Sequence, residues 1–243
     1  MRVMSTTVLA LAVLGLAPAD PTIGSYVQSG FKDAAFSAKV QSANQKELAK
    51  INQDFAKSYR FKSSNIWLKE PMKLRMESRV EDTDIFFIVN GGKKLVRVPR
   101  ANINQRDDVS KSPGKRQTPL DFGLLTPSLF NNFFQAKYVR TESSGDYKGD
   151  AVFDLTYVPS LDDSSRHRIW VDQKTKYTEK REWYSQQGYL MAVFTYDQPK
   201  LFGSVYIPTK MTVKNADGKT GGSTLYTSVK VNIGMDDDLF KVD

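Results

Sequence analysis

Short runs of strand-forming residues, separated by turn residues, recur through the second half of the chain and constrain its fold most strongly. Between residues 137 and 231 we expect about six strands, and the segments "SSGDYKGD", "PSLDDSS", "SQQG" and "NADGKTGG" mark the turns between them. Residues 167–196 read as two or three of these strands, rich in aromatic and aliphatic side chains. Because no helical segments alternate with the strands, the sheet should be antiparallel.

The first half of the chain adds more strands and one helix. Met72, Leu74 and Met76 alternate with charged residues, which predicts a strand with one buried face. "DIFFIVN" follows, and "NGGK" at residues 90–93 predicts a tight hairpin because Asn and Gly tolerate a positive φ. Residues 45–57 have apolar side chains near helical spacing and predict one helix.

A polar segment and an apolar segment lie in the middle of the chain. Residues 100–117 contain five basic and two acidic side chains and read as a loop that could dock a membrane or a partner. After it, Thr118-Pro119 and Thr126-Pro127 each pair a capping residue with proline at the first helical position. We therefore expect two short helices, divided near residues 123–125, with more apolar surface than one neighbour requires. They could form part of the core or cover a cavity.

The N-terminal residues 1–19 have the three parts of a secretory signal peptide. Arg2 supplies the positive charge, residues 8–16 are apolar, and residues 17–19 read Ala-Pro-Ala, which would leave Asp20 as the first mature residue. The apolar run is too short to span a bilayer, although a first core helix is the alternative. We expect an exported, soluble chain whose residues 20–243 form a single domain.

Composition narrows the possible chemistry. The chain has no cysteine, which excludes disulfides, zinc–thiolate sites, thiol nucleophiles and a lipid anchor on cysteine. Its net charge of +8 suits anionic phospholipid or acidic partners. The positive charges are scattered and no nucleic-acid-binding motif is present, so we expect no nucleic-acid partner.

Catalytic patterns are missing from the sequence. His167 is the only histidine, and between Arg166 and Arg168 it reads as a surface strand residue. Glu179 and Glu182 cannot pair directly, because odd spacing places them on opposite faces of one strand. Two further acidic clusters, at residues 162–163 and 236–238, match no calcium loop and read as solvated turns. We expect a non-enzyme without cofactor or metal.

The order of these segments resembles a known superfamily. The strand "IWLKEPMKLRMES" leads into "IFFIVNGGKKLVRVP" and the short apolar helices, and "RIWVDQKTKYTEKREWYSQQGYL", "VYIPTKMTV" and "VNIGMDDDLFKV" follow. This succession, over roughly residues 36–242, resembles the outer-membrane lipoprotein-sorting, or LolA-like, superfamily. The resemblance implies a mainly β fold with a few helices: a curved antiparallel sheet forming an unclosed half-barrel, with helices covering its concave face.

The resemblance also implies a function. It suggests a monomeric periplasmic carrier that holds the acyl chains of a lipoprotein or phospholipid in an apolar groove, for transfer across the periplasm to the outer membrane. A membrane-bound release complex and an outer-membrane acceptor would be its partners. The sequence departs from the family at Glu70, since the lipoprotein carrier has arginine just before the corresponding proline, which it uses to hold the lid and make transfer one-way. Glu70 therefore favours another lipid or an envelope component as cargo.

Candidate site residues follow from the carrier hypothesis. The groove wall is expected to contain Phe61, Leu68, Leu74, Met76, Phe87, Trp170, Trp183, Leu190, Phe194, Ile207 and Met211. The lid helices would contribute Leu120, Phe122, Leu125, Leu129, Phe130 and Phe133. Because side chains alternate along a strand, only one face of each strand can line the groove.

An alternative within the same resemblance is an RseB-like regulatory module in the periplasm. Such a module would sense envelope components or bind a membrane protein through an exposed edge strand or the basic loop. It would depend on Lys111, Lys115 and Arg116 and would tolerate changes in the lid.

Overall fold

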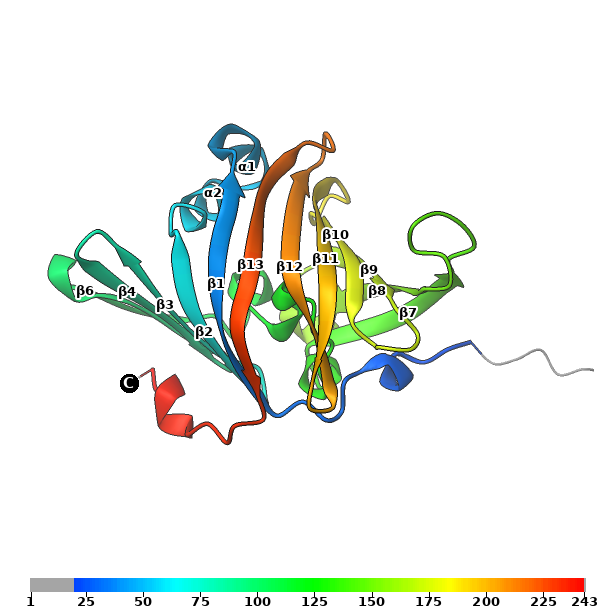
Figure 1. Cartoon of the computed structure of the whole chain (residues 1–243), viewed down its shortest axis with the longest axis horizontal. Coiled ribbons are helices and arrows are strands. Elements are labelled where there is room, and N and C mark those ends of the chain that lie inside the picture. The colour runs from blue at the N-terminus through cyan, green and yellow to red at the C-terminus, as the bar shows by residue number, and fades with distance from the viewer. Residues whose placement is uncertain (1–19, 243) are drawn as a thin grey trace, which may run out of the picture.

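A computed structural model describes residues 20–242, and one antiparallel sheet dominates it (Figure 1). The strands are β1 (Asp33–Ala43), β2 (Ser63–Lys69), β3 (Lys73–Val80), β4 (Thr83–Asn90), β5 (Lys93–Val98), β6 (Ile103–Asp108), β7 (Phe134–Thr141), β8 (Ala151–Tyr157), β9 (Arg166–Val171), β10 (Thr178–Tyr184), β11 (Leu190–Phe202), β12 (Val205–Asn215) and β13 (Thr220–Val231). The α-helices are α1 (Gln45–Ile51) and α2 (Gln53–Ser58). Seven 3-10 turns complete the elements: η1 (Ile23–Tyr26), η2 (Pro99–Ala101), η3 (Pro113–Lys115), η4 (Pro119–Phe122), η5 (Pro127–Phe130), η6 (Pro159–Leu161) and η7 (Asp237–Phe240).

The sheet has its first and last strands side by side at its centre. Its order is β6-β5-β4-β3-β2-β1-β13-β12-β11-β10-β9-β8-β7. Apart from β1 and β13, all strands that are neighbours in the sheet are also consecutive in sequence. The edge strands β6 and β7 are not paired with each other, and the sheet remains open. Figure 1 shows the strands fanning in a strong curve around the short turns between β6 and β7. The predicted curved, unclosed half-barrel is confirmed.

Local sequence explains the strands that were predicted best. In β3, Leu74 is buried while its neighbours Lys73 and Arg75 are only partly covered, as alternation requires. The β4–β5 hairpin closes with Asn90 opposite Lys93, and Gly91 has a φ of 58° in the turn. The left-handed conformation that glycine adopts without steric cost is therefore used where the "NGGK" segment predicted it.

The helix expected over residues 45–57 is divided in two. Asn52 adopts an extended conformation with φ −169° and ψ 140°, and its side chain accepts hydrogen bonds from the backbone N–H groups of Asp54 and Phe55. Asn52 thus ends α1 and caps α2, as a short polar side chain favours. Leu48 and Ile51 of α1 pack with Phe194 of β11, so the helices cover one end of the curved face.

The opposite face of β2–β5 is covered by the C-terminal segment. Phe240 is fully buried and packs with Met235, Val242, Ile88 and Leu95. The backbone carbonyl oxygens of Leu239, Phe240 and Val242 accept hydrogen bonds from Arg75, Asn90 and Arg106, respectively. Residues 235–242 therefore cover this face of β2–β5.

Two parts of the chain differ from expectation. Residues 100–117 were expected to be a loop, but they contain the edge strand β6, most of whose side chains are exposed, and the turns η2 and η3. The region from residue 134 to 231 holds seven strands rather than about six. The expected signal peptide, residues 1–19, lies outside the described residues. Within residues 20–242, no helix combines the length and apolar character needed to cross a membrane.

Candidate functional site

The segment between the two edge strands lies in the hollow of the sheet. We call residues 118–133 the cover segment; it contains η4 and η5. Its four leucines, Leu120, Leu124, Leu125 and Leu129, are all fully buried. The two short helices predicted from the Thr-Pro pairs are therefore present as 3-10 turns, and their apolar side chains point into the fold.

Capping and one glycine fix the backbone of η4. The Thr118 backbone N–H donates to Oδ2 of Asp121 at 2.8 Å, which fastens the start of the turn. Gly123 ends it with a φ of 78°. A Cβ atom at this position would lie 2.8 Å from Cδ1 of Tyr196 and 2.9 Å from Cγ of Pro208. Only glycine therefore allows the cover segment to turn this close to β11 and β12.

The cover segment bridges the two halves of the sheet. Leu120, Leu125 and Leu129 belong to an apolar cluster with side chains of β8 and β9, including Phe153 and Ile169. A second cluster unites Leu124 and Phe122 with Phe36 of β1, Leu68 of β2 and Ile207 of β12. A chain segment of sixteen residues therefore fills most of the concave face, and its removal would expose both clusters.

A small number of polar contacts tie η4 to the sheet. The Tyr196 hydroxyl donates to the carbonyl oxygen of Leu120 at 3.0 Å, and the Thr178 N–H donates to that of Gly123 at 3.2 Å. The buried guanidinium of Arg181 donates to Oδ1 of Asp121 at 2.9 Å. These contacts connect the turn to β10 and β11 alone.

Glu70 holds η5 from the other side. It follows β2, and its two carboxylate oxygens accept hydrogen bonds from Ser128: Oε2 from the backbone N–H at 3.0 Å and Oε1 from the hydroxyl at 2.7 Å. The first backbone N–H groups of a helical turn have no partner within the turn, and a carboxylate satisfies them well. Glu70 is therefore a clamp on the cover segment.

Six of the predicted wall residues gather on the concave face. Leu68, Leu74 and Ile207 are buried in the second cluster, and Met76, Phe87 and Met211 are half-buried against it. Two more, Phe194 and Trp183, pack in the neighbouring cluster beneath α1 and α2. Among the predicted lid residues, Phe122 and Phe130 are half-buried and the rest are buried.

Three predicted wall residues lie elsewhere. The Trp170 indole donates to Glu142 at 2.9 Å and carries the Lys180 ammonium 3.9 Å above its ring, so it does not face the cover segment. Phe61 follows α2, and Leu190 lies at the start of β11; both are half-buried outside the four apolar clusters. The face on which a strand residue lies depends on register, which alternation alone does not fix.

The water-free slot expected between sheet and helices is filled by the chain's own side chains. Within residues 20–242, two surface depressions, of about 410 and 370 Å³, are lined mainly by polar residues and lie away from the cover segment. The leucines of the cover segment occupy the place where a ligand was expected. A groove could form only if this segment moved.

His167 and the basic segment also differ from expectation. His167 is buried rather than exposed, with its ring against Phe134, and burial together with nearby Arg181 holds its pKa well below the usual value. Arg116 donates to the carbonyl oxygens of Val109 and Ser110, and Lys111 donates to that of Ser160. Two of the three basic residues assigned to partner docking therefore make contacts within the chain.

The contacts of the cover segment were not foreseen from the sequence. Asp121, Arg181 and Tyr196 are far apart in the chain, and only the sheet order brings them together. No sequence pattern around Glu70 or Ser128 indicates that these two residues are in contact.

The sequence and the structure were compared with family models, curated proteins and solved structures. A family model described as an uncharacterized protein matches residues 129–243, and a search of curated proteins finds no match. A DUF1329 family protein from Desulfovibrio piger has a TM-score of 0.64 at 14% identity, covering 92% of this chain and 98% of its own. A putative outer membrane lipoprotein-sorting protein domain from Vibrio parahaemolyticus has a TM-score of 0.62 at 11% identity, covering 90% of this chain and 92% of its own.

A LolA superfamily protein from Nitrosomonas europaea is also similar, with a TM-score of 0.54 at 16% identity, covering 86% of this chain and 88% of its own. At these identities the comparisons establish the fold. The chain has the architecture of the DUF1329 and LolA-superfamily lipoprotein-sorting structures.

Proposed function

We propose that this chain is a periplasmic carrier that binds the acyl chains of a lipoprotein or phospholipid by exchanging them for the leucines of the cover segment. The single observation that supports the proposal most strongly is that four fully buried leucines sit on two short 3-10 turns. Such turns have little internal stability. Their burial depends on the sheet, so the sheet can accept other hydrocarbon in their place.

The energies of the two occupants are similar. Burying a leucine side chain contributes roughly 1.5–3 kcal/mol, so the four leucines contribute about 6–12 kcal/mol. An acyl chain of about sixteen carbons gains ~0.8 kcal/mol for each methylene, or about 12 kcal/mol in all. Because the upper end of the leucine range meets the acyl-chain figure, the two occupants can compete and the exchange would be reversible. Reversibility is what a carrier needs, since it must release its cargo to an acceptor in the outer membrane.

A half-exposed apolar rim supplies the place of first contact. Met76, Phe87, Phe122 and Met211 are only partly covered, and all pack against the cluster that contains Leu124. A hydrocarbon chain that touched these side chains would lose contact with water before the cover segment moved. Entry between the rim and Phe122 would then displace Leu124 first.

Neighbouring phenylalanines on β4 provide a matched test. Phe87 faces the cover segment, whereas Phe86 lies on the other face beneath the Arg97 guanidinium, 4.7 Å from the ring centroid. Both are half-buried. We expect Phe87→Glu to weaken binding of a fluorescent long-chain fatty acid at least tenfold, because it places a charge on the acyl path, while Phe86→Glu leaves binding near the wild-type value. Equal binding by both variants, or no binding by the wild-type chain, would overturn the proposal.

A further inference from the structure

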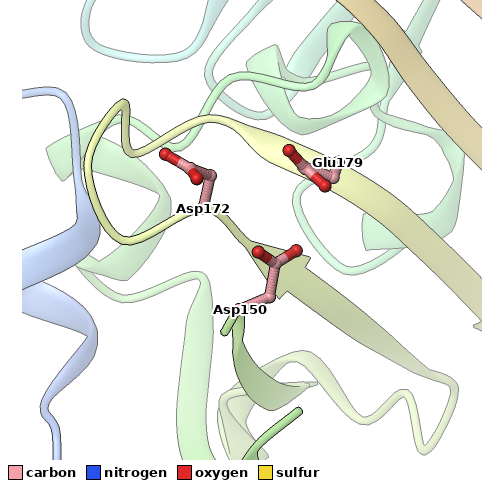
Figure 2. A group of neighbouring side chains, drawn as sticks. All are labelled: Asp150, Asp172 and Glu179. Carbon is pink, nitrogen blue, oxygen red and sulfur yellow. The ribbon is translucent and has the colours of Figure 1, made fainter. Parts of the chain in front are cut away.

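Three carboxylates gather at the end of the sheet near β8, away from the clamp at Glu70. Asp150 directly precedes β8, Asp172 directly follows β9, and Glu179 lies in β10; Figure 2 shows the three side chains projecting from separate segments around a common space. One oxygen atom from each carboxylate lies within 4.8 Å of the others. Three negative groups at this separation repel one another unless something lies between them.

The Asp150 side chain distinguishes this group from an ordinary acidic patch. Asp150 is 4% exposed, and its Oδ2 atom is buried with no hydrogen-bond partner among the described residues. Figure 2 shows its carboxylate directed toward Asp172 and Glu179. A buried polar atom without a partner is rare in folded proteins and often indicates a missing ion or water.

Nearby cations do not neutralise the group. Arg140 pairs with Glu142, and Lys180 pairs with Glu182 and covers Trp170. None of the ion pairs found within residues 20–242 involves Asp150, Asp172 or Glu179. The Lys174 charge lowers the pKa of Asp172, so the chain compensates the negative charge of the group only in part.

The surrounding hydrogen bonds orient two of the carboxylates and leave one oxygen of each available. Oδ1 of Asp172 accepts hydrogen bonds from the backbone N–H groups of Lys174 and Thr175 at 3.0 and 2.6 Å, and Oε1 of Glu179 accepts one from the Tyr177 hydroxyl at 3.0 Å. Among the described residues, no donor reaches their second oxygens or Oδ2 of Asp150.

We propose that Asp150, Asp172 and Glu179 bind a calcium ion that ties the loop before β8 to the β9–β10 turn. All three ligands are carboxylate oxygens, which hard cations prefer, and the chain has no cysteine to favour a softer metal. Calcium fits better than magnesium because it accepts irregular geometry, whereas magnesium requires a nearly ideal octahedron. This site is independent of acyl-chain binding.

A shared proton is the competing occupant. Without a cation, burial and the neighbouring carboxylates of Glu179 and Asp172 raise the pKa of Asp150 to about 7, so one carboxyl group could stay protonated and donate to its neighbour. The two states differ in one measurable respect, because only the metal site responds to added calcium at constant pH.

Thermal unfolding with and without calcium separates these states. The full chain, freed of metal with a chelator and dialysed, is titrated with CaCl2 at fixed pH and ionic strength. We expect the Tm to rise by several degrees and to saturate with a Kd of about 10⁻⁴ M, typical of exported calcium sites. MgCl2 at the same concentration should produce a smaller rise.

Three variants complete the test. Asp150→Asn and Asp172→Asn each remove one negative charge. In Asp172→Asn, the amide oxygen still accepts the hydrogen bond from the Thr175 N–H, so this variant should fold even if Asp150→Asn does not. Each should weaken calcium binding at least tenfold by titration calorimetry. Asp82→Asn, at an exposed carboxylate, is the control and should bind as the wild type does. No calcium response in the wild-type chain, an equal response to magnesium, or an undiminished response in Asp172→Asn would overturn the proposal.

Discussion

Replacing Glu70 by alanine should loosen the cover segment without unfolding the sheet. Glu70 makes two hydrogen bonds to Ser128, at 3.0 and 2.7 Å, and both use an ionised acceptor. Ser128 is buried, so its N–H and hydroxyl would lose their partner in a place that water reaches poorly. Such bonds contribute about 1.5–3 kcal/mol each in a protected setting. Because Glu70 is half-exposed, we expect a combined loss of about 1–3 kcal/mol.

This loss of free energy increases the population of molecules in which the cover segment is open. Every 1.4 kcal/mol changes an equilibrium tenfold, so the open population of the cover segment should increase by about 5- to 140-fold. Hydrogen exchange of the amides in residues 118–133 reports that population directly when closing is fast. The apparent affinity for a fatty acid should rise by the same factor, because a larger fraction of molecules would be competent to bind.

A matched glutamate provides the control. Glu77 is also half-buried, but it lies on β3 and pairs with Arg75 rather than with the cover segment. Glu77→Ala should leave exchange in residues 118–133 unchanged. A wild-type exchange rate in Glu70→Ala would show that Glu70 does not hold the cover segment, and an equal rise in the central strands β1 and β13 would indicate global unfolding instead.

Two further predictions concern stability. Gly123→Ala should lower the free energy of unfolding by about 2–4 kcal/mol in urea denaturation, since the added methyl group meets the Tyr196 ring and the left-handed backbone is strained; an unchanged midpoint would contradict the close packing. Glu142→Gln should flatten the acid limb of the stability curve. Arg140 and the Trp170 indole lower the pKa of Glu142 to about 2, so its contribution is present above about pH 4.5 and is lost as the pH falls toward 2. Parallel urea midpoints for variant and wild type between pH 7 and 2.5 would contradict this.

Short sequence patterns predicted much of the fold, because strand alternation, turn conformation and helix capping depend on residues close together in the chain. Alternation around Leu74 identified β3, and "NGGK" identified the β4–β5 hairpin. The Thr-Pro pairs located both turns of the cover segment. The edge strand β6 was missed because it pairs on one side only and exposes most of its side chains, so its sequence carries no apolar alternation.

The contacts that define the site depend on register and topology, which one sequence does not reveal. Trp170 was assigned to the groove, but it lies on the other face of β9. His167 was expected at the surface because arginines flank it, yet the flanking residues point away and the imidazole packs inward. Asp150 and Glu179 meet only because β8, β9 and β10 are consecutive in the sheet.

The exchange of hydrocarbon for the leucines of the cover segment can be tested in one experiment. Hydrogen exchange of the wild-type chain is followed while a long-chain fatty acid is added to saturation. We expect faster exchange in residues 118–133, as the acyl chain displaces them, together with slower exchange in the concave strands that it then covers. Slower exchange in residues 118–133, or no change in any segment at saturating fatty acid, would contradict it.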